Sequence, residues 1–294
     1  MLSASSSRDI LLEAMEKCKT KDGYVREVVG APEPMAFLAA ERQLKDIELY
    51  CCQEDAFSVL GIDPTFNLGN FSVTPTTYRC HKIVNVSTGK SPVFLSPMLV
   101  HQSKTEQTYQ YLASSVKQFN PNTVSLQAFG TDDERALSNA FNEEFPVGGL
   151  GDSLNTINDN EEENHLLKLK TDHKRVNLET LIEKSHELVK EQDSLLKGAI
   201  IDQGKCRLSD ECKHLKISPE KGRKMNRTER RAYTKKAKES GPMSQTFSTL
   251  SISHTQSGIS GIPEIILSHQ FPEAQRLLRM NKVRHGFGET ILYW

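Results

Sequence analysis

Two aspartates follow apolar runs that have the composition of β-strands. Asp63 comes directly after the run VLGI, and Asp132 closely follows the segment TVSLQAF. A carboxylate at a strand end is most often a solvated surface group, but two carboxylates held side by side repel each other unless they share a cation or a proton. Magnesium or manganese held by carboxylates activates water and stabilises a leaving oxygen in phosphodiester cleavage. Such a site needs at least a third acid.

The order of the predicted elements brings the two aspartates together. Three strand-like runs, a helical run, a fourth strand-like run and a second helical run occupy residues 57–66, 71–79, 93–100, 103–118, 123–129 and 132–145. Three consecutive strands favour an antiparallel meander. Because a right-handed helical crossover returns a strand parallel to an earlier one, we expect the fourth strand beside the first. Asp63 and Asp132 would then lie at the same edge of the sheet.

Helical periodicity surrounds this core. Amphipathic helices are predicted over 7–20 and 35–50, and a longer helical stretch over 161–200. Residues 227–238 favour a short helix, 240–260 read as a Ser/Thr/Gly linker, and 263–280 as one more amphipathic helix.

Four stretches resemble the transposase domain of the Mutator-like element family: GIDPTFNLGNFSVTPTTYR, PVFLSPMLVHQ, TYQYLASSV and LQAFGTDDERAL. The resemblance implies an RNase H-like fold and a catalytic Asp-Asp-Glu set that holds magnesium or manganese. The family's Asp-x-Thr-Phe motif corresponds here to Asp63-Pro64-Thr65-Phe66. Its Thr-Asp-x-Glu-x-Ala motif begins here at Thr131, which makes Asp132 the second acid.

The family's third acid is a helical glutamate followed by Asn three residues later, and then by apolar residues and Lys. The stretch EEENHLLK, which begins at Glu161, fits this pattern, and Glu161 is the predicted third catalytic and metal-binding residue. A run of glutamates is otherwise typical of a solvated helix start.

The chain departs from the family pattern between Asp132 and Glu161, which are only 29 positions apart. In the family this interval holds a fifth strand with a Cys/His motif and a long helical insertion, whereas here no cysteine occurs between Cys80 and Cys206. The family's C-terminal zinc module is also expected to be missing. Genuine loss and a faulty exon join both remain open, and in either case we expect impaired catalysis.

A basic segment is the second candidate for function. Residues 205–238 contain 13 Lys and Arg but only 4 Asp and Glu. Such a segment can bind the phosphates of DNA or act as a nuclear import signal, while the bland alternative is a solvated, partly disordered tail. The predicted DNA-binding residues are Lys221, Arg223, Lys224, Arg227, Arg230, Arg231, Lys235 and Lys236.

Composition limits the remaining classes. The 294 residues carry a formal net charge of −1, and no apolar run approaches the roughly 20 residues of a membrane helix. The N-terminal residues lack the unbroken apolar region of a signal peptide. The six cysteines are scattered, as in proteins of a reducing compartment. We therefore expect a nuclear or cytoplasmic protein that is not secreted, binds DNA and does not associate with a membrane. The sequence does not determine its oligomeric state.

Together these patterns predict an α/β fold: an incomplete RNase H-like mixed sheet of about four strands with flanking helices and a helical, partly disordered C-terminal half. The predicted segments are an N-terminal helical segment, a partial core, an acidic loop, a helical extension, a basic segment and a linker with a C-terminal helix, over 1–55, 56–146, 147–160, 161–204, 205–240 and 241–294. The predicted function is that of a transposase-derived protein whose ancestral reaction was metal-dependent DNA cleavage and strand transfer. The alternatives are a non-catalytic DNA- or protein-binding derivative and a non-functional remnant.

Overall fold

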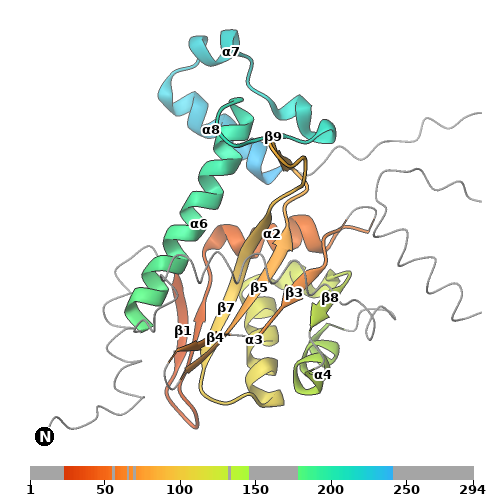
Figure 1. The fold of residues 1–294 in the computed structure, drawn as a ribbon, viewed down its shortest axis with the longest axis vertical. Helices are drawn as coiled ribbons and strands as arrows, with labels where there is room; N and C mark the ends of the chain where they lie inside the picture. Colours follow the sequence, from red (N-terminus) through yellow and green to blue (C-terminus); the bar gives the residue numbers. More distant parts are fainter. Residues whose placement is uncertain are drawn as a thin grey trace, which may run out of the picture. The chain divides into compact units, whose positions relative to one another are not determined.

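A computed structural model describes residues 23–54, 57–64, 66–68, 71–131, 134–145 and 178–240. These residues lie within one compact unit and form a mixed α/β fold, in which helices pack on a mixed sheet (Figure 1). The expected α/β class is confirmed at this level. In this described part, no helix is long and apolar enough to cross a membrane.

The centre of the sheet consists of β5 (Phe71–Arg79) and β7 (Val93–His101), which run antiparallel. All residues of β7 and all but the last of β5 are buried, because both faces of the sheet are covered. Pro75 has no N–H for the ladder, and the register shifts between Pro75 and Thr77. The strand β5 nevertheless runs without a break from Phe71 to Arg79.

The described sheet extends to both sides of this pair in the order β1-β2-β7-β5-β3-β8. The added strands are β1 (Val25–Val29), β2 (Met35–Leu38), β3 (Leu60–Ile62) and β8 (Phe129–Thr131). Neighbouring strands are antiparallel except for β3 and β8, which are parallel. This parallel pair is the arrangement that the predicted crossover requires.

The predicted first strand, 57–66, is shorter and interrupted. It ends at Ile62, and a second short strand, β4 (Phe66–Leu68), pairs with the same edge of β5. The interruption falls at Asp63 and Pro64, where proline cannot donate a ladder hydrogen bond. Asp63 therefore lies at a break in the strand.

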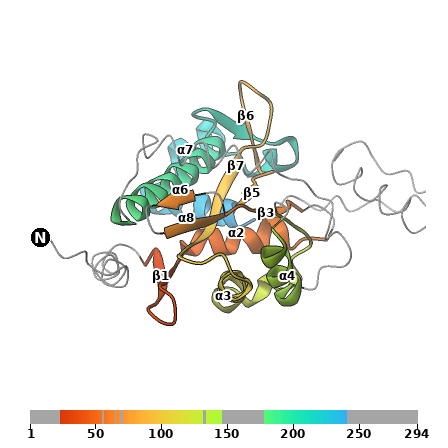
Figure 2. The ribbon, with the colours of Figure 1, turned by 60° about the horizontal axis from the view of Figure 1, so that its bottom comes forward.

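Helices cover both faces of the sheet. On one face, α2 (Glu41–Cys51), α3 (Glu106–Phe119) and α4 (Arg135–Glu144) pack against Phe37, Phe94 and Leu99. On the other face, α6 (Leu178–Ile200) packs against the alternate residues of the same strands. Figure 2 shows the sheet between α6 and the pair α3 and α4.

Two predicted elements need correction. The helix predicted over 35–50 is a strand, Met35–Leu38, followed by a helix that begins only at Glu41, so the segment 1–55 is not purely helical and the sheet has more than four strands. The run MAFL is apolar throughout because both of its faces are buried, and periodicity alone cannot distinguish such a strand from a buried helix. The strand predicted over 123–129 begins only at Phe129, since Asn120 and Pro121 start the 3₁₀ helix η1 (Pro121–Ser125).

A smaller module follows α6. A ribbon of β6 (Ile83–Asn85) and β9 (Cys206–Leu208) leads into the 3₁₀ helix η2 (Asp210–Leu215) and the helices α7 (Pro219–Lys224) and α8 (Arg227–Glu239). The helix predicted near 227–238 is confirmed. The alternative of a disordered basic tail is wrong for residues 205–240, which are folded. The predicted helices at 7–20 and 263–280, the acidic loop and residues 161–177 lie outside the described residues.

Candidate functional site

Asp63 lies where β3 and β8 run side by side. Ile62 pairs with Thr131 in the parallel ladder, so Asp63 and Asp132 are the next residues along two neighbouring strands. The Asp63 N–H donates to the carbonyl of Pro75 at 3.3 Å, and the residue is half-buried. Asp132 and Glu161 lie outside the described residues. The expected pairing of the two strands that precede Asp63 and Asp132 is therefore confirmed, whereas Glu161 is not placed.

Polar side chains from α3, α4 and the loop before α3 gather around this edge. Lys104 donates from Nζ to the carbonyl of Pro64 at 2.8 Å. The Tyr109 hydroxyl donates to Oε1 of Glu134, the residue that precedes α4, at 2.8 Å. Sequence reasoning did not select Lys104 or Glu134. Glu134 does, however, belong to the motif that marked Asp132, and that motif was the available signal.

His101 is the last residue of β7, near the same end of the sheet, and its role is structural rather than that of an acid or base. Burial lowers the pKa of His101 to about 4, so the imidazole is neutral near pH 7. Its Nδ1 lies 2.8 Å from the carbonyl of Ser103, which fixes the ring proton on Nδ1. Nε2 then accepts from the hydroxyl of Thr74 at 2.8 Å. With both nitrogens engaged, His101 is not available as a general base.

The described residues alone do not make a metal site. Within them, no group of three or more His, Cys, Asp or Glu side chains is arranged to hold a metal ion. Of the three predicted ligands only Asp63 is described. The five described cysteines are buried free thiols, consistent with the scattered spacing in the sequence.

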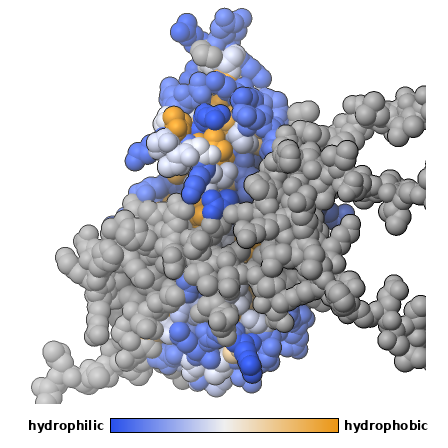
Figure 3. All heavy atoms as spheres, turned by 45° about the vertical axis from the view of Figure 1, so that its right-hand side comes forward, coloured by the Kyte–Doolittle hydropathy of each residue, from blue (hydrophilic) through white to orange (hydrophobic). Residues whose placement is uncertain are grey.

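The eight predicted DNA-binding cations are all exposed on α7, α8 and the turn between them. Within the described part of the chain, none of them forms an ion pair with a carboxylate. Glu229, a carboxylate close to them in sequence, instead closes a capping box, in which it accepts from the Asn226 N–H at 2.8 Å. Figure 3 shows that the surface at the top of the view, over this module, is largely hydrophilic.

The spacing of these cations costs stability. Arg227, Arg231 and Lys235 follow one another at intervals of four along α8, so that like charges share one helix face. Each such pair destabilises a helix by about 0.2–0.5 kcal/mol, and a bound polyanion would reverse the sign of that interaction. Lys221 adds a contact of another kind, because its Nζ lies 4.4 Å from the centroid of the Tyr233 ring.

The C-terminal end of α8 is fastened to the core by Lys82, which follows β5. This side chain is 1 % exposed, and its Nζ donates to the backbone carbonyls of Ala237, at 3.1 Å, and of Lys238. Burial lowers the pKa of Lys82. A cation placed against the last carbonyls of a helix is favoured by the helix dipole, so this contact anchors α8.

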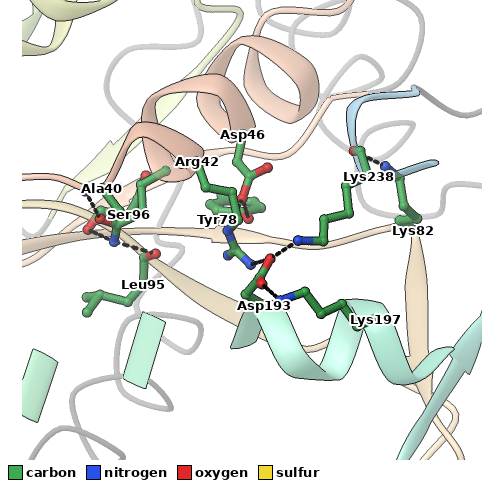
Figure 4. Close-up of polar contacts among 11 residues, drawn as sticks. Ala40, Arg42, Asp46, Tyr78, Lys82, Leu95, Ser96, Asp193, Lys197 and Lys238 are labelled. Carbon is green, nitrogen blue, oxygen red and sulfur yellow. Dashed lines mark hydrogen bonds and ion pairs between the residues drawn. The ribbon is translucent and has the colours of Figure 1, made fainter. Parts of the chain in front are cut away.

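Asp193 on α6 forms a second link (Figure 4). It pairs with Lys238 of α8, with Lys197 at 2.6 Å, and with Arg42 of α2 at 3.7 Å. Burial alone would raise the pKa of Asp193, but the two lysine ammonium groups hold it below its usual value. One carboxylate thus joins three helices.

Arg42 continues this chain of charges into the core. Its Nε lies 3.1 Å from Oδ2 of Asp46, which also accepts from the Tyr78 hydroxyl at 2.6 Å. The guanidinium stacks over the Phe94 ring, with its Cζ 5.3 Å from the centroid. Its contacts with the carboxylates are ion pairs without the alignment of hydrogen bonds. Burial raises the pKa of Asp46, against the opposing effects of Arg42 and Tyr78.

Comparisons of the chain with protein-family models, with curated proteins and with solved structures gave no match. The function of this chain is therefore inferred from its residues, its strand topology and its charges.

Proposed function

We propose that this chain is a transposase-derived DNA-binding protein of the Mutator-like type, with an incomplete RNase H-like core whose metal-dependent cleavage is impaired. The order β7-β5-β3-β8 supports the RNase H-like assignment. Three antiparallel strands are followed by the crossover helix α3 and by a strand parallel to the first, which is the arrangement that the motif resemblance implies.

The parallel ladder between β3 and β8 is the observation that carries this proposal. It pairs Ile62 with Thr131, and each of these residues is followed directly by one of the two aspartates that the resemblance selects. Magnesium or manganese bound there together with Glu161 would supply water activation and charge stabilisation for phosphodiester cleavage. The chain's own part would be to hold its carboxylates rigidly at that edge.

The lateral position of β8 in the sheet accounts for the proposed loss of activity. In the described part of the sheet β8 is the last strand, so a neighbour on its outer side is not among the described elements. Glu161 follows Asp132 by only 29 positions in the sequence. A ligand displaced by about 1 Å can lower the rate on the order of a hundredfold. We therefore propose weak or absent nicking.

A non-catalytic DNA-binding derivative is the second candidate function. The eight exposed cations, which form no ion pair with a described carboxylate, favour it, because they are carried by folded helices anchored to the core through Lys82 and Asp193. Binding through phosphates is independent of sequence and weakens steeply with salt. A protein-binding role is not favoured by any described feature. A nuclear or cytoplasmic location fits both candidates.

The two candidates are separated by incubating the 294-residue chain with supercoiled DNA and magnesium or manganese. Slow conversion to open circles that is lost in Asp63→Ala supports residual catalysis. Glu54→Ala is a suitable control, because Glu54 is an exposed acid outside the strands. Salt-sensitive retention of DNA that survives Asp63→Ala, without nicking, supports the binding derivative. Failure of the wild-type chain both to nick and to retain DNA would refute both functions.

A further inference from the structure

The ribbon tip, defined as residues 86–90 and 201–205, presents apolar and basic side chains to solvent, and its one carboxylate, Asp202, pairs with Lys216 at 2.7 Å. Val86 is 61 % exposed and Ile201 is 43 % exposed, and only Val124 joins them as an exposed large hydrophobic residue in the described part of the chain. Lys90 and Lys205 are exposed at the same two turns and form no ion pair with a described carboxylate.

Hydrogen bonds hold the ribbon tip in shape. The Val86 N–H donates to the carbonyl of Lys205 at 2.9 Å and so joins the two turns. The N–H groups of Asn85 and Gly89 close the first turn through the carbonyls of Lys90 and Asn85, each at 2.8 Å. Gly89 has a φ of +70°, a left-handed conformation that suits glycine. Because the turn is already ordered, a ligand that contacts Val86 would lose little affinity to ordering.

The ribbon tip belongs to the same module as the basic helices. The Ile217 N–H, just before α7, donates to the carbonyl of Ile200 at 2.9 Å. The hydroxyl of Tyr233 on α8 lies 3.3 Å from the carbonyl of Leu215, which it approaches as donor. Figure 2 shows the turn after β6 projecting beyond the neighbouring helices. A ligand bound on α8 can therefore meet a second rigid element of the module.

We propose that the ribbon tip is a second contact for double-stranded DNA, an inference that rests on the proposed binding of DNA by α7 and α8. Lys90 and Lys205 contact phosphates, and Val86 packs on sugar or base edges inside a groove. Two cations that form no ion pair with a described carboxylate lie beside the exposed valine, and they favour a polyanion over an apolar protein surface. A two-stranded ribbon fits the major groove, which is about 12 Å wide, and this fit favours a duplex over a single strand.

The test measures binding of a fluorescently labelled 20-base-pair duplex, and of one of its strands alone, by anisotropy at several salt concentrations with the full chain. In Lys90→Ala/Lys205→Ala, the slope of log affinity against log salt should become shallower by about 2, since each phosphate contact contributes about 0.9. Val86→Ala should weaken duplex binding about fivefold with the slope unchanged, because the lost contact is apolar. Val124→Ala and Lys45→Ala are matched controls on other elements and should change neither quantity.

The outcomes separate this inference from the proposed function. If Arg227→Ala/Arg231→Ala weakens binding while the variants of the ribbon tip behave like Val124→Ala, the ribbon tip is not a contact and only this inference is overturned. Equal effects of Val86→Ala on the duplex and on the single strand would overturn the fit to a groove. Failure of the wild-type chain to bind either probe would overturn both proposals. Circular dichroism melting of each variant guards against misfolding, and a misfolded Val86→Ala is replaced by Val86→Thr, which should show the same unchanged slope.

Discussion

His101 illustrates at the scale of one residue how burial decides charge in this sheet. Its imidazole is enclosed at the end of β7 and contacts the Tyr109 ring edge-on. Both of its nitrogens form hydrogen bonds, with Thr74 and Ser103. Protonation would force Nε2 to donate toward a hydroxyl that now donates to it. The nearby charged groups are Lys104, which also disfavours the cation, and Glu33, which favours it more weakly than burial opposes it.

Stability should therefore fall in mild acid because of His101. Its pKa is about 4 in the folded chain and near 6.5 when unfolded, so between these values the unfolded state binds a proton that the folded state refuses. From pH 7 to pH 5 this difference amounts to about 2 kcal/mol of unfolding free energy. Urea unfolding at both pH values measures it. His101→Gln, which does not titrate, should show a pH dependence smaller by that amount, and an unchanged dependence would contradict the assignment.

At the scale of elements, Asp193 is the point where α2, α6 and α8 meet. Asp193→Asn removes the charge but keeps the shape, and it leaves Arg42, Lys197 and Lys238 close together without their anion. Because this side chain is only 19 % exposed, we expect a loss of about 2 kcal/mol in urea unfolding. Glu187→Gln on the same helix breaks an exposed pair with Lys184 and should cost less than about 0.5 kcal/mol. Equal effects of the two substitutions would show that the Asp193 contacts are no stronger than a surface pair.

The elements that sequence predicted correctly are those with local signals. The crossover from β7 through α3 to β8 and the capped helix α8 follow from periodicity, capping residues and handedness. The ribbon was missed because β6 and β9 pair across more than 120 positions of sequence. The residue pattern of each short strand, taken alone, does not differ from that of a loop. The strand β2 was missed because its apolar run continues directly into the pattern of α2.

The same distinction applies to the candidate site. Asp63 stood out because a carboxylate interrupts an apolar run, and the pairing of its strand with β8 follows from topology. The residues that contact the site, and those that anchor the basic helices to the core, were not predictable. Lys82 meets Ala237 from 155 positions away, and Arg42 meets Asp193 across a comparable interval. Such contacts are decided by tertiary packing, which leaves no periodic trace in the sequence.

At the scale of the whole molecule, a net charge of −1 hides a separation of charge. Bulk attraction to DNA is therefore not expected, and binding must come from the local field of α7, α8 and the ribbon tip. That field acts over about a Debye length, roughly 8 Å at physiological salt. The anchors at Lys82 and Asp193 consequently matter for function, because they fix this charged surface to the sheet.

The remaining alternative, a remnant without a defined role, predicts a chain that lacks cooperative structure. In the folded chain, by contrast, the slowest amide protons should be those of β5 and β7, which are paired on both sides and buried on both faces. The amides of α8 should exchange sooner through local opening, because Ala237 is the one buried residue of that helix. Hydrogen exchange followed by mass spectrometry distinguishes these patterns, with the chain in 6 M guanidinium as the unprotected reference. Exchange of β5 and β7 at the reference rate would support the remnant and remove the rigid scaffold on which both the Asp63 edge and the basic helices depend.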